Sequence, residues 1–321
     1  MSLYDLKSVQ DYGDYSLNNI LRESLLYFFN WSFLNIGAFQ NVQLSSSGAI
    51  GYDNSKLYNI TGPSYYTAGK YWQTNRQNYV WESGVSYNGQ TPINISGVYV
   101  NGTFQPSTGV GAFAHTIDYI NGQVKFTTAI SPSSVVRMEY PYKRVKFTTV
   151  DDVEFKKLQE KSLLHNDTNF TLGSGDNQQL SPYRVQTPLV AIQPVPRRNY
   201  PNGIELGGGT YLQQDVLFHV YADTSTERDK LFDIISNQYN KAINLVNINK
   251  LAENNAFPIN TYGNIVNQLT RNYENMAGPT SQYAWRQCVF DKVIGQEQTS
   301  LNSSIFGATV RVTMKIPMSD I

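Results

Sequence analysis

Residues 211–250 constrain the fold of this chain more than any other stretch, because they read as a strand followed at once by a capped helix. In the strand, Val216, Phe218 and Val220 alternate with residues that are also largely apolar, which indicates a central strand covered on both faces. Thr224 and Glu227 have the spacing of a capping box, so a helix should begin there. The sequence predicts one helix over residues 226–246, because apolar or packing residues recur at spacings of three and four at Leu231, Ile234, Ile235, Gln238, Tyr239, Ala242, Ile243 and Val246.

The rest of the C-terminal half has the pattern of a mainly antiparallel sheet. A strand is expected at residues 187–193, and a long loop rich in proline and glycine from Pro194 to Thr210. Alternating segments at 283–294 and 305–316 close the chain as two further strands. Before these two segments, the Asn-rich residues 254–278 are expected to order only on assembly. Residues 183–321 should therefore form an α/β domain in which one long helix covers a mainly antiparallel sheet.

Residues 1–150 are expected to form a β-sandwich-like or barrel domain with an N-terminal helix, which makes the whole chain α+β. An amphipathic helix is expected after Ser16, and its apolar continuation at residues 31–36 should serve a domain core, which is favoured, or a subunit contact. Farther on, Asn-Gly pairs at 88–89, 101–102 and 121–122 separate β-branched and aromatic runs, which is the strongest short hairpin signal.

Residues 151–182 read as a connector between the two domains. They begin with a short charged helix whose apolar positions are Val153, Leu158 and Leu164. A stretch rich in Asn, Asp, Gly and Ser follows, which is the composition of a linker. The domain boundary is therefore placed here.

Charge and hydropathy exclude some classes of partner. Charged residues are only 16% of the 321, and Lys+Arg and Asp+Glu balance at 25 each, so no basic surface for nucleic acid is expected. Short basic runs are expected at solvated strand or loop positions, namely Lys143, Arg144 and Lys146, and Arg197 and Arg198. No apolar segment is long enough to span a bilayer, and residues 1–10 lack the apolar run of a signal peptide. No membrane partner is expected.

No catalytic, cofactor-binding or metal-binding set is found. His115, His165 and His219 lie in different predicted settings, and none has metal-ligand spacing with another His or with Cys. Cys288 lies in an apolar strand and is expected to be a core residue. The three glycines at 207–209 lack the helix start and the Lys-Ser/Thr of a phosphate loop. The sequence therefore predicts a protein that is not an enzyme and has no cofactor.

Aromatic residues gather between Tyr65 and Trp81, and two interpretations of them stay open. Aromatic faces pack on pyranose rings, so the group could form a sugar-binding platform. In a Tyr-rich β-domain the same residues also serve as core and subunit contacts, which is the favoured interpretation. The residues concerned are Tyr65, Tyr66, Tyr71, Trp72, Tyr79 and Trp81.

Residues 183–321 resemble a group of phage proteins. The run Gly207-Gly208-Gly209-Thr210-Tyr211 leading into Val216-Leu217-Phe218-His219-Val220-Tyr221-Ala222-Asp223, then Ser225-Thr226-Glu227-Arg228-Asp229-Lys230-Leu231, is similar to the strand–helix core of tail terminator and related neck proteins of tailed bacteriophages. Residues 98–102 and 118–126 look like modules of phage virion proteins. The resemblance implies a virion structural protein that forms a ring in the neck, usually of six copies, terminating the tail tube and sheath and joining them to the head.

The resemblance also implies the partners. They would be further copies of the chain and the tail tube, sheath and head-connector proteins, with DNA only passing through the ring lumen. The loop at 194–210 would reach the adjacent copy, held by the helix at 226–246, while the N-terminal domain would lie outside the ring. Two alternatives remain: a fibre-attachment or receptor-binding virion protein with the cluster from Tyr65 to Trp81 as its glycan site, and, less favoured, a glycan hydrolase.

Overall fold

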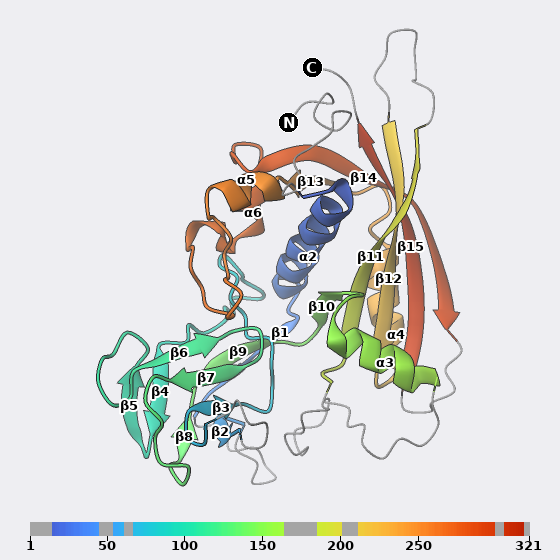
Figure 1. Ribbon diagram of the computed structural model, residues 1–321. Coiled ribbons are helices and arrows are strands. Elements are labelled where there is room, and N and C mark those ends of the chain that lie inside the picture. Colours follow the sequence, from blue (N-terminus) through green and yellow to red (C-terminus); the bar gives the residue numbers. More distant parts are fainter. Residues whose placement is uncertain are drawn as a thin grey trace.

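The computed structural model describes residues 15–44, 54–60, 67–163, 185–200, 211–298 and 305–317. In these residues the protein is mixed α+β, with mostly antiparallel, curled sheets and few helices, as the sequence predicts at this level (Figure 1). A six-stranded sheet and a seven-stranded sheet form two units, and a two-stranded ladder lies between them. We call these the six-stranded unit and the seven-stranded unit.

The six-stranded sheet has the predicted strand at its centre. Neighbouring strands are antiparallel except for the first pair, which is parallel. The central strand buries alternate residues, and the side chains between them are mostly half-buried. In sheet order the strands are β10 (Lys146–Thr149), β11 (Leu189–Asn199), β12 (Tyr211–Ala222), β15 (Phe306–Pro317), β14 (Ala284–Gln298) and β13 (Ala242–Val246).

Helix α2 (Leu17–Asn35) packs on the buried face of this sheet (Figure 1). Phe29, which is 1% exposed, stacks against Phe147 and meets Phe218 edge-on, with ring centroids 5.5 and 5.1 Å away. Ser24 Oγ accepts a hydrogen bond from Val246 N at 2.9 Å. The sequence grouped this helix with the β-rich residues of the N-terminal half, whereas its side chains lie in the core of the six-stranded unit. Apolar periodicity identifies the buried face of a helix but not the sheet that it meets.

Helix α4 (Ser225–Ser236) begins where the capping box predicts, because Thr224 Oγ1 accepts a hydrogen bond from Glu227 N at 3.2 Å. The prediction of one helix continuing to residue 246 is wrong. Asn240, with a φ of 60°, lies in the turn after α4, and Ala242–Val246 then form the edge strand β13. Ile243 and Leu245 are both buried, which is the alternation of a strand. The sequence predicts a helix at Ala242, Ile243 and Val246 because their spacing also fits a helical period.

Helix α3 (Val153–Leu163) packs on the opposite face of the sheet. Its Phe155 ring lies 5.5 Å from the His219 ring and 5.9 Å from the Tyr221 ring, and these residues alternate along β12 with those that meet α2. Leu158 is also buried, whereas Val153, predicted as an apolar contact, is 63% exposed. The predicted helix is confirmed, but it lies in the chain between β10 and β11 of the six-stranded sheet, so it covers that sheet and does not connect the two units.

The seven-stranded sheet consists of short antiparallel strands. The predicted hairpins at Asn101-Gly102 and Asn121-Gly122 are both present. In the first, Asn101 and Gly102 have φ of 50° and 85°, as a two-residue hairpin turn requires. In sheet order the strands are β5 (Thr103–Pro106), β4 (Gly97–Val100), β8 (Val136–Arg137), β2 (Lys56–Asn59), β3 (Tyr71–Gln73), β7 (Gln123–Phe126) and β6 (His115–Asp118).

The seven-stranded unit is an insertion into the six-stranded unit. Strands β1 (Phe39–Val42) and β9 (Tyr140–Lys143) form the antiparallel ladder, and the chain between them builds the seven-stranded sheet. From β9 the chain passes directly into β10 of the six-stranded sheet. Residues 135–147 therefore contain β8, β9 and the start of β10, which belong to three different sheets.

The long loop predicted from Pro194 is shorter than expected, because β11 continues to Asn199. Its remaining part, with the glycines at 207–209, lies outside the described residues. The same holds for Leu164, His165, Tyr65, Tyr66 and the linker at 165–182.

Candidate functional site at the junction of the two sheets

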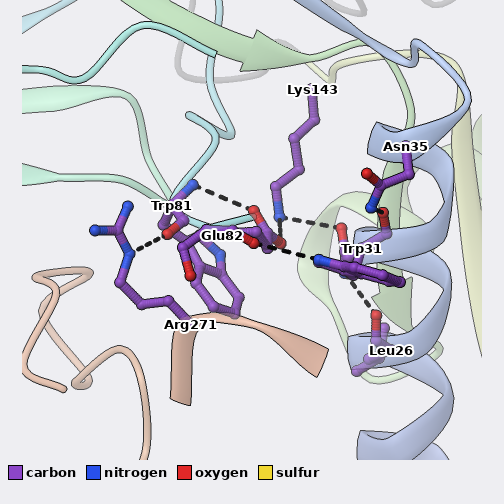
Figure 2. A network of polar contacts seen from close by, with 9 residues as sticks. Leu26, Trp31, Asn35, Trp81, Glu82, Lys143 and Arg271 are labelled. Carbon is purple, nitrogen blue, oxygen red and sulfur yellow. Dashed lines mark hydrogen bonds and ion pairs between the residues drawn. The ribbon is translucent and has the colours of Figure 1, made fainter. Parts of the chain in front are cut away.

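A buried ion pair lies where the two units meet. Glu82 follows β3 and Lys143 ends β9, and the Glu82 Oε1 and Lys143 Nζ atoms are 2.5 Å apart (Figure 2). The side chains of Lys143 and Glu82 are only 9% and 2% exposed. Asn30 of α2 adds a third partner, because its Oδ1 accepts a hydrogen bond from Lys143 Nζ at 3.1 Å. The pair therefore joins the helix of the six-stranded unit to the inserted unit.

Trp81, next to this ion pair, is held on both sides. Its ring centroid lies 5.1 Å from Lys143 Nζ, within cation–π range, and its carbonyl accepts a hydrogen bond from Arg271 Nε at 2.5 Å. Ser83 N donates to Arg271 O at 2.9 Å, and Ser83 O accepts from Trp31 Nε1 of α2 at 3.3 Å (Figure 2). Three segments distant in sequence thus meet at one short stretch of the inserted unit.

Residues 254–278 form a strap that spans the junction. The strap follows α5 (Ile248–Glu253) and contains η1 (Leu269–Arg271) and α6 (Tyr273–Ala277). Its Tyr273 lies in the core of the six-stranded unit, while Asn264 Nδ2 donates a hydrogen bond to Ile117 O of the seven-stranded unit at 2.8 Å. The sequence predicted that this segment orders only on assembly, whereas these contacts hold it within a single chain.

The buried charges of the junction have partners within the chain. Glu82 accepts hydrogen bonds from Lys143 and from the Trp81 amide, so the buried charges face each other and polar partners rather than solvent. A buried pair of this kind costs desolvation energy and is tolerated only with good geometry and further hydrogen bonds. We interpret the junction as a rigid joint that sets the angle between the two units.

A polar cleft of about 500 Å³ also lies between the units. Arg76 and Arg144 line one side of it, and Asp223 and Glu227 at the start of α4 line the other. A hydrogen bond to the Asp223 carboxyl, together with burial, raises the pKa of Glu227 to about 7. Near neutral pH the two carboxyl groups therefore share one proton for part of the time.

The substitution Glu227→Gln is expected to reduce the pH dependence of stability. The folded-state pKa of Glu227 lies above its ordinary value of 4.5, so the folded chain keeps a proton that the unfolded chain has lost. The free energy of unfolding should therefore fall as the pH rises through about 7. Urea unfolding between about pH 5 and pH 8 should show this decline in the wild type and a weaker decline in Glu227→Gln. Equal slopes in the two proteins would contradict the shared proton.

The structure does not bring the sequence candidates together. Cys288 is fully buried in the main core, and burial raises the pKa of its thiol, which confirms the core prediction. His219 is packed in the sheet with Nε2 2.8 Å from Gln193 Oε1, and burial lowers its pKa. His115 is buried in β6. In the part of the chain that the structure describes, no group of three or more His, Cys, Asp or Glu could hold a metal ion.

Two members of the aromatic cluster are not available to a sugar. Trp72 is 2% exposed and Tyr79 is 0% exposed, and both lie in the core of the seven-stranded sheet. Trp81 belongs to the junction, and Tyr71 is half-buried with Lys125 Nζ 5.4 Å from its ring centroid. For Trp72 and Tyr79 the favoured interpretation, core packing, is confirmed.

Sequence reasoning missed the junction residues. Lys143 was expected at a solvated position, but it is buried. The position of Glu82 could have predicted a buried charge, because it is a carboxylate directly after the apolar run 79–81. A core accepts such a charge only with a partner. Nothing in the sequence indicated that this partner lies on β9.

Comparison with known protein-family models and with curated proteins finds no match for this chain. Among the described residues, no helix is both long and apolar enough to cross a membrane.

Proposed function

We propose that the protein is a structural component of a tailed-phage virion that forms a ring in the neck, terminating the tail tube and sheath and joining them to the head. The proposal starts from the resemblance of residues 207–231 to tail terminator and neck proteins. It is supported by the position of β12 and α4, which form a strand–helix unit at the centre of a mostly antiparallel sheet. In this proposal the unit is the frame of an assembly module.

The observation that carries the proposal is an open edge of the six-stranded sheet. Strand β14 has 15 residues, but β13 pairs only with its first part, from Ala284 to Val289. The last backbone contact on that side is at Phe290, and no described residue pairs with the outer side of residues 292–298. An edge of this kind can pair with another chain, and every copy in a closed ring needs an unsaturated surface for its neighbour.

The seven-stranded unit supplies a second surface in this proposal. It projects to one side of the six-stranded unit (Figure 1) and is fixed there by the junction of Glu82 and Lys143. It would lie outside the ring and contact sheath, collar or head proteins, while DNA would only pass through the lumen. A rigid joint suits this role, because the outer unit must meet its partners at a set angle.

Electron microscopy of the purified full-length chain tests the proposal. Negative-stain images should show a closed ring with a central hole, and native mass spectrometry should show one oligomer at a whole-number multiple of the chain mass. Six copies is the number that the resemblance implies. A chain that stays monomeric at every concentration tested would overturn the proposal.

A further inference from the structure

Two described stretches of the six-stranded sheet have an unpaired edge, residues 194–199 of β11 and residues 292–298 of β14. They differ in how well they resist the addition of a further strand. Beyond β10, residues 194–199 of β11 pair only with β12, and this edge contains Pro194 and Pro196, followed by two arginines. Proline has no N–H to donate, so it blocks the addition of a further strand. The free part of β14, residues 292–298, contains no proline, and its Glu297 is paired with Arg228 of α4. Of these two described stretches, the β14 edge is the one that no proline blocks.

A groove lies directly beside the open edge. Its volume is about 540 Å³, and it runs between the end of α4 and β14. Tyr239, which lines the groove, is 58% exposed, and the buried Ser236 Oγ has no hydrogen-bond partner among the described residues. An added strand could place side chains against the aromatic wall and a polar group near Ser236. The lining residues are Phe232, Ser236, Tyr239, Asp291, Lys292, Val293 and Gly295.

The opposite side of the molecule carries a complementary surface. In Figure 1 the β4–β5 hairpin lies at the lower left, and β14 ends at the right. The hairpin exposes Phe104, which is 41% exposed, and the following loop exposes Val110, which is 96% exposed. Its turn makes Val100 and Thr103 a hydrogen-bonded pair, so the Phe104 N–H and C=O point away from β4 toward the free edge.

We propose that copies of the chain associate head to tail, with the β4–β5 hairpin of one copy in the groove beside residues 292–298 of the next and Phe104 as the inserted side chain. This inference rests on the proposed ring and names its contact. Each copy would use both surfaces, and such a heterologous contact can close into a ring by rotation.

The charges of the two surfaces do not oppose this contact with a second copy. Residues 97–112 of the hairpin contain no charged side chain. In the groove wall, the Asp291 carboxylate pairs with Lys315 Nζ at 2.7 Å. The formal net charge of the chain is +0, so no long-range repulsion between copies opposes the contact.

Cysteine cross-linking tests the contact in the full chain. The pair Phe104→Cys and Tyr239→Cys should give a ladder of disulfide-linked species on a non-reducing gel after mild oxidation, because Tyr239 lines the groove. The native Cys288 is fully buried and should not contribute. Ile120→Cys with Tyr239→Cys is the matched control, because Ile120 is 44% exposed and Phe104 is 41% exposed. The first pair should cross-link several times more than the control pair, and equal yields would overturn the inference.

A charged residue at position 104 tests the same contact independently of cross-linking. Phe104→Asp should shift native mass spectra from the oligomer toward the monomer, with thermal stability little changed because the side chain is exposed. Ile120→Asp should leave the oligomer intact. An intact ring in Phe104→Asp would refute the contact but not the ring. Disulfide-linked chains that never close would refute the ring but not the contact, and a monomer without cross-links would refute both.

Discussion

Replacing Glu82 with alanine is expected to lower the free energy of unfolding by about 3–5 kcal/mol, the cost of removing one partner from a buried ion pair. Lys143 would keep its charge with a side chain only 9% exposed, and it would retain Asn30 as its hydrogen-bond partner. The Trp81 amide would lose its acceptor as well. Urea unfolding followed by tryptophan fluorescence measures the change, because Trp81 lies at the junction.

Two comparison variants show whether the loss comes from the buried charge. Asp151→Ala removes the partner of Arg22 in a surface pair, where the Asp151 side chain is 73% exposed, and it should cost less than about 1 kcal/mol. Glu82→Leu combined with Lys143→Met removes both charges and should recover much of the loss, because an apolar replacement of a buried pair is often neutral. A loss below about 1 kcal/mol for Glu82→Ala would show that the junction is solvated.

Local features of this fold could be predicted from the sequence because neighbouring residues determine them. The cap at Thr224, the hairpin at Asn101-Gly102 and the half-buried strand β15 each follow from a short pattern. These patterns depend on backbone geometry and on a period of burial, and both can be read within a few residues. The mixed α+β class follows from the same signals.

The partners of these elements could not be predicted, since they depend on contacts between residues far apart in sequence. α2 has the expected apolar stripe, yet it covers a sheet built mainly from the C-terminal half. Residues 242–246 satisfy both a helical and an alternating pattern, and pairing with β14 favours the strand. Lys143 looked like a surface residue until β9 brought it to Glu82. The candidate site was missed because it exists only where three such segments meet.

The position of α2 also changes how the proposed ring should be tested. A truncation that removes residues 1–150 would remove α2 and β10 together, and both lie against the core of the six-stranded sheet. Loss of oligomers in such a fragment would reflect unfolding rather than a role of the seven-stranded unit. Point substitutions in the full chain separate the two effects.

Phe29→Ala is the substitution in α2 with the largest expected effect, about 3–5 kcal/mol of lost stability. The ring is 1% exposed and is surrounded by aromatic rings of the six-stranded unit, so its removal leaves a cavity between helix and sheet. Its contacts lie in α2, β10, β12 and β14, with ring centroids 5.1 to 6.2 Å away, which is within the range of favourable aromatic pairs. They are Phe28, Phe33, Phe147, Phe218 and Phe290.

Hydrogen exchange distinguishes this role of Phe29 from a general loss of stability. Amides of β11 and β12 should exchange faster in Phe29→Ala, because α2 covers that face of the sheet. Amides of β4 and β5 should change least, since they lie in the other unit. Ile36→Ala, at the end of the same helix and 50% exposed, should change stability by less than about 0.5 kcal/mol. Faster exchange confined to the seven-stranded unit would mean that α2 stabilises the inserted unit instead.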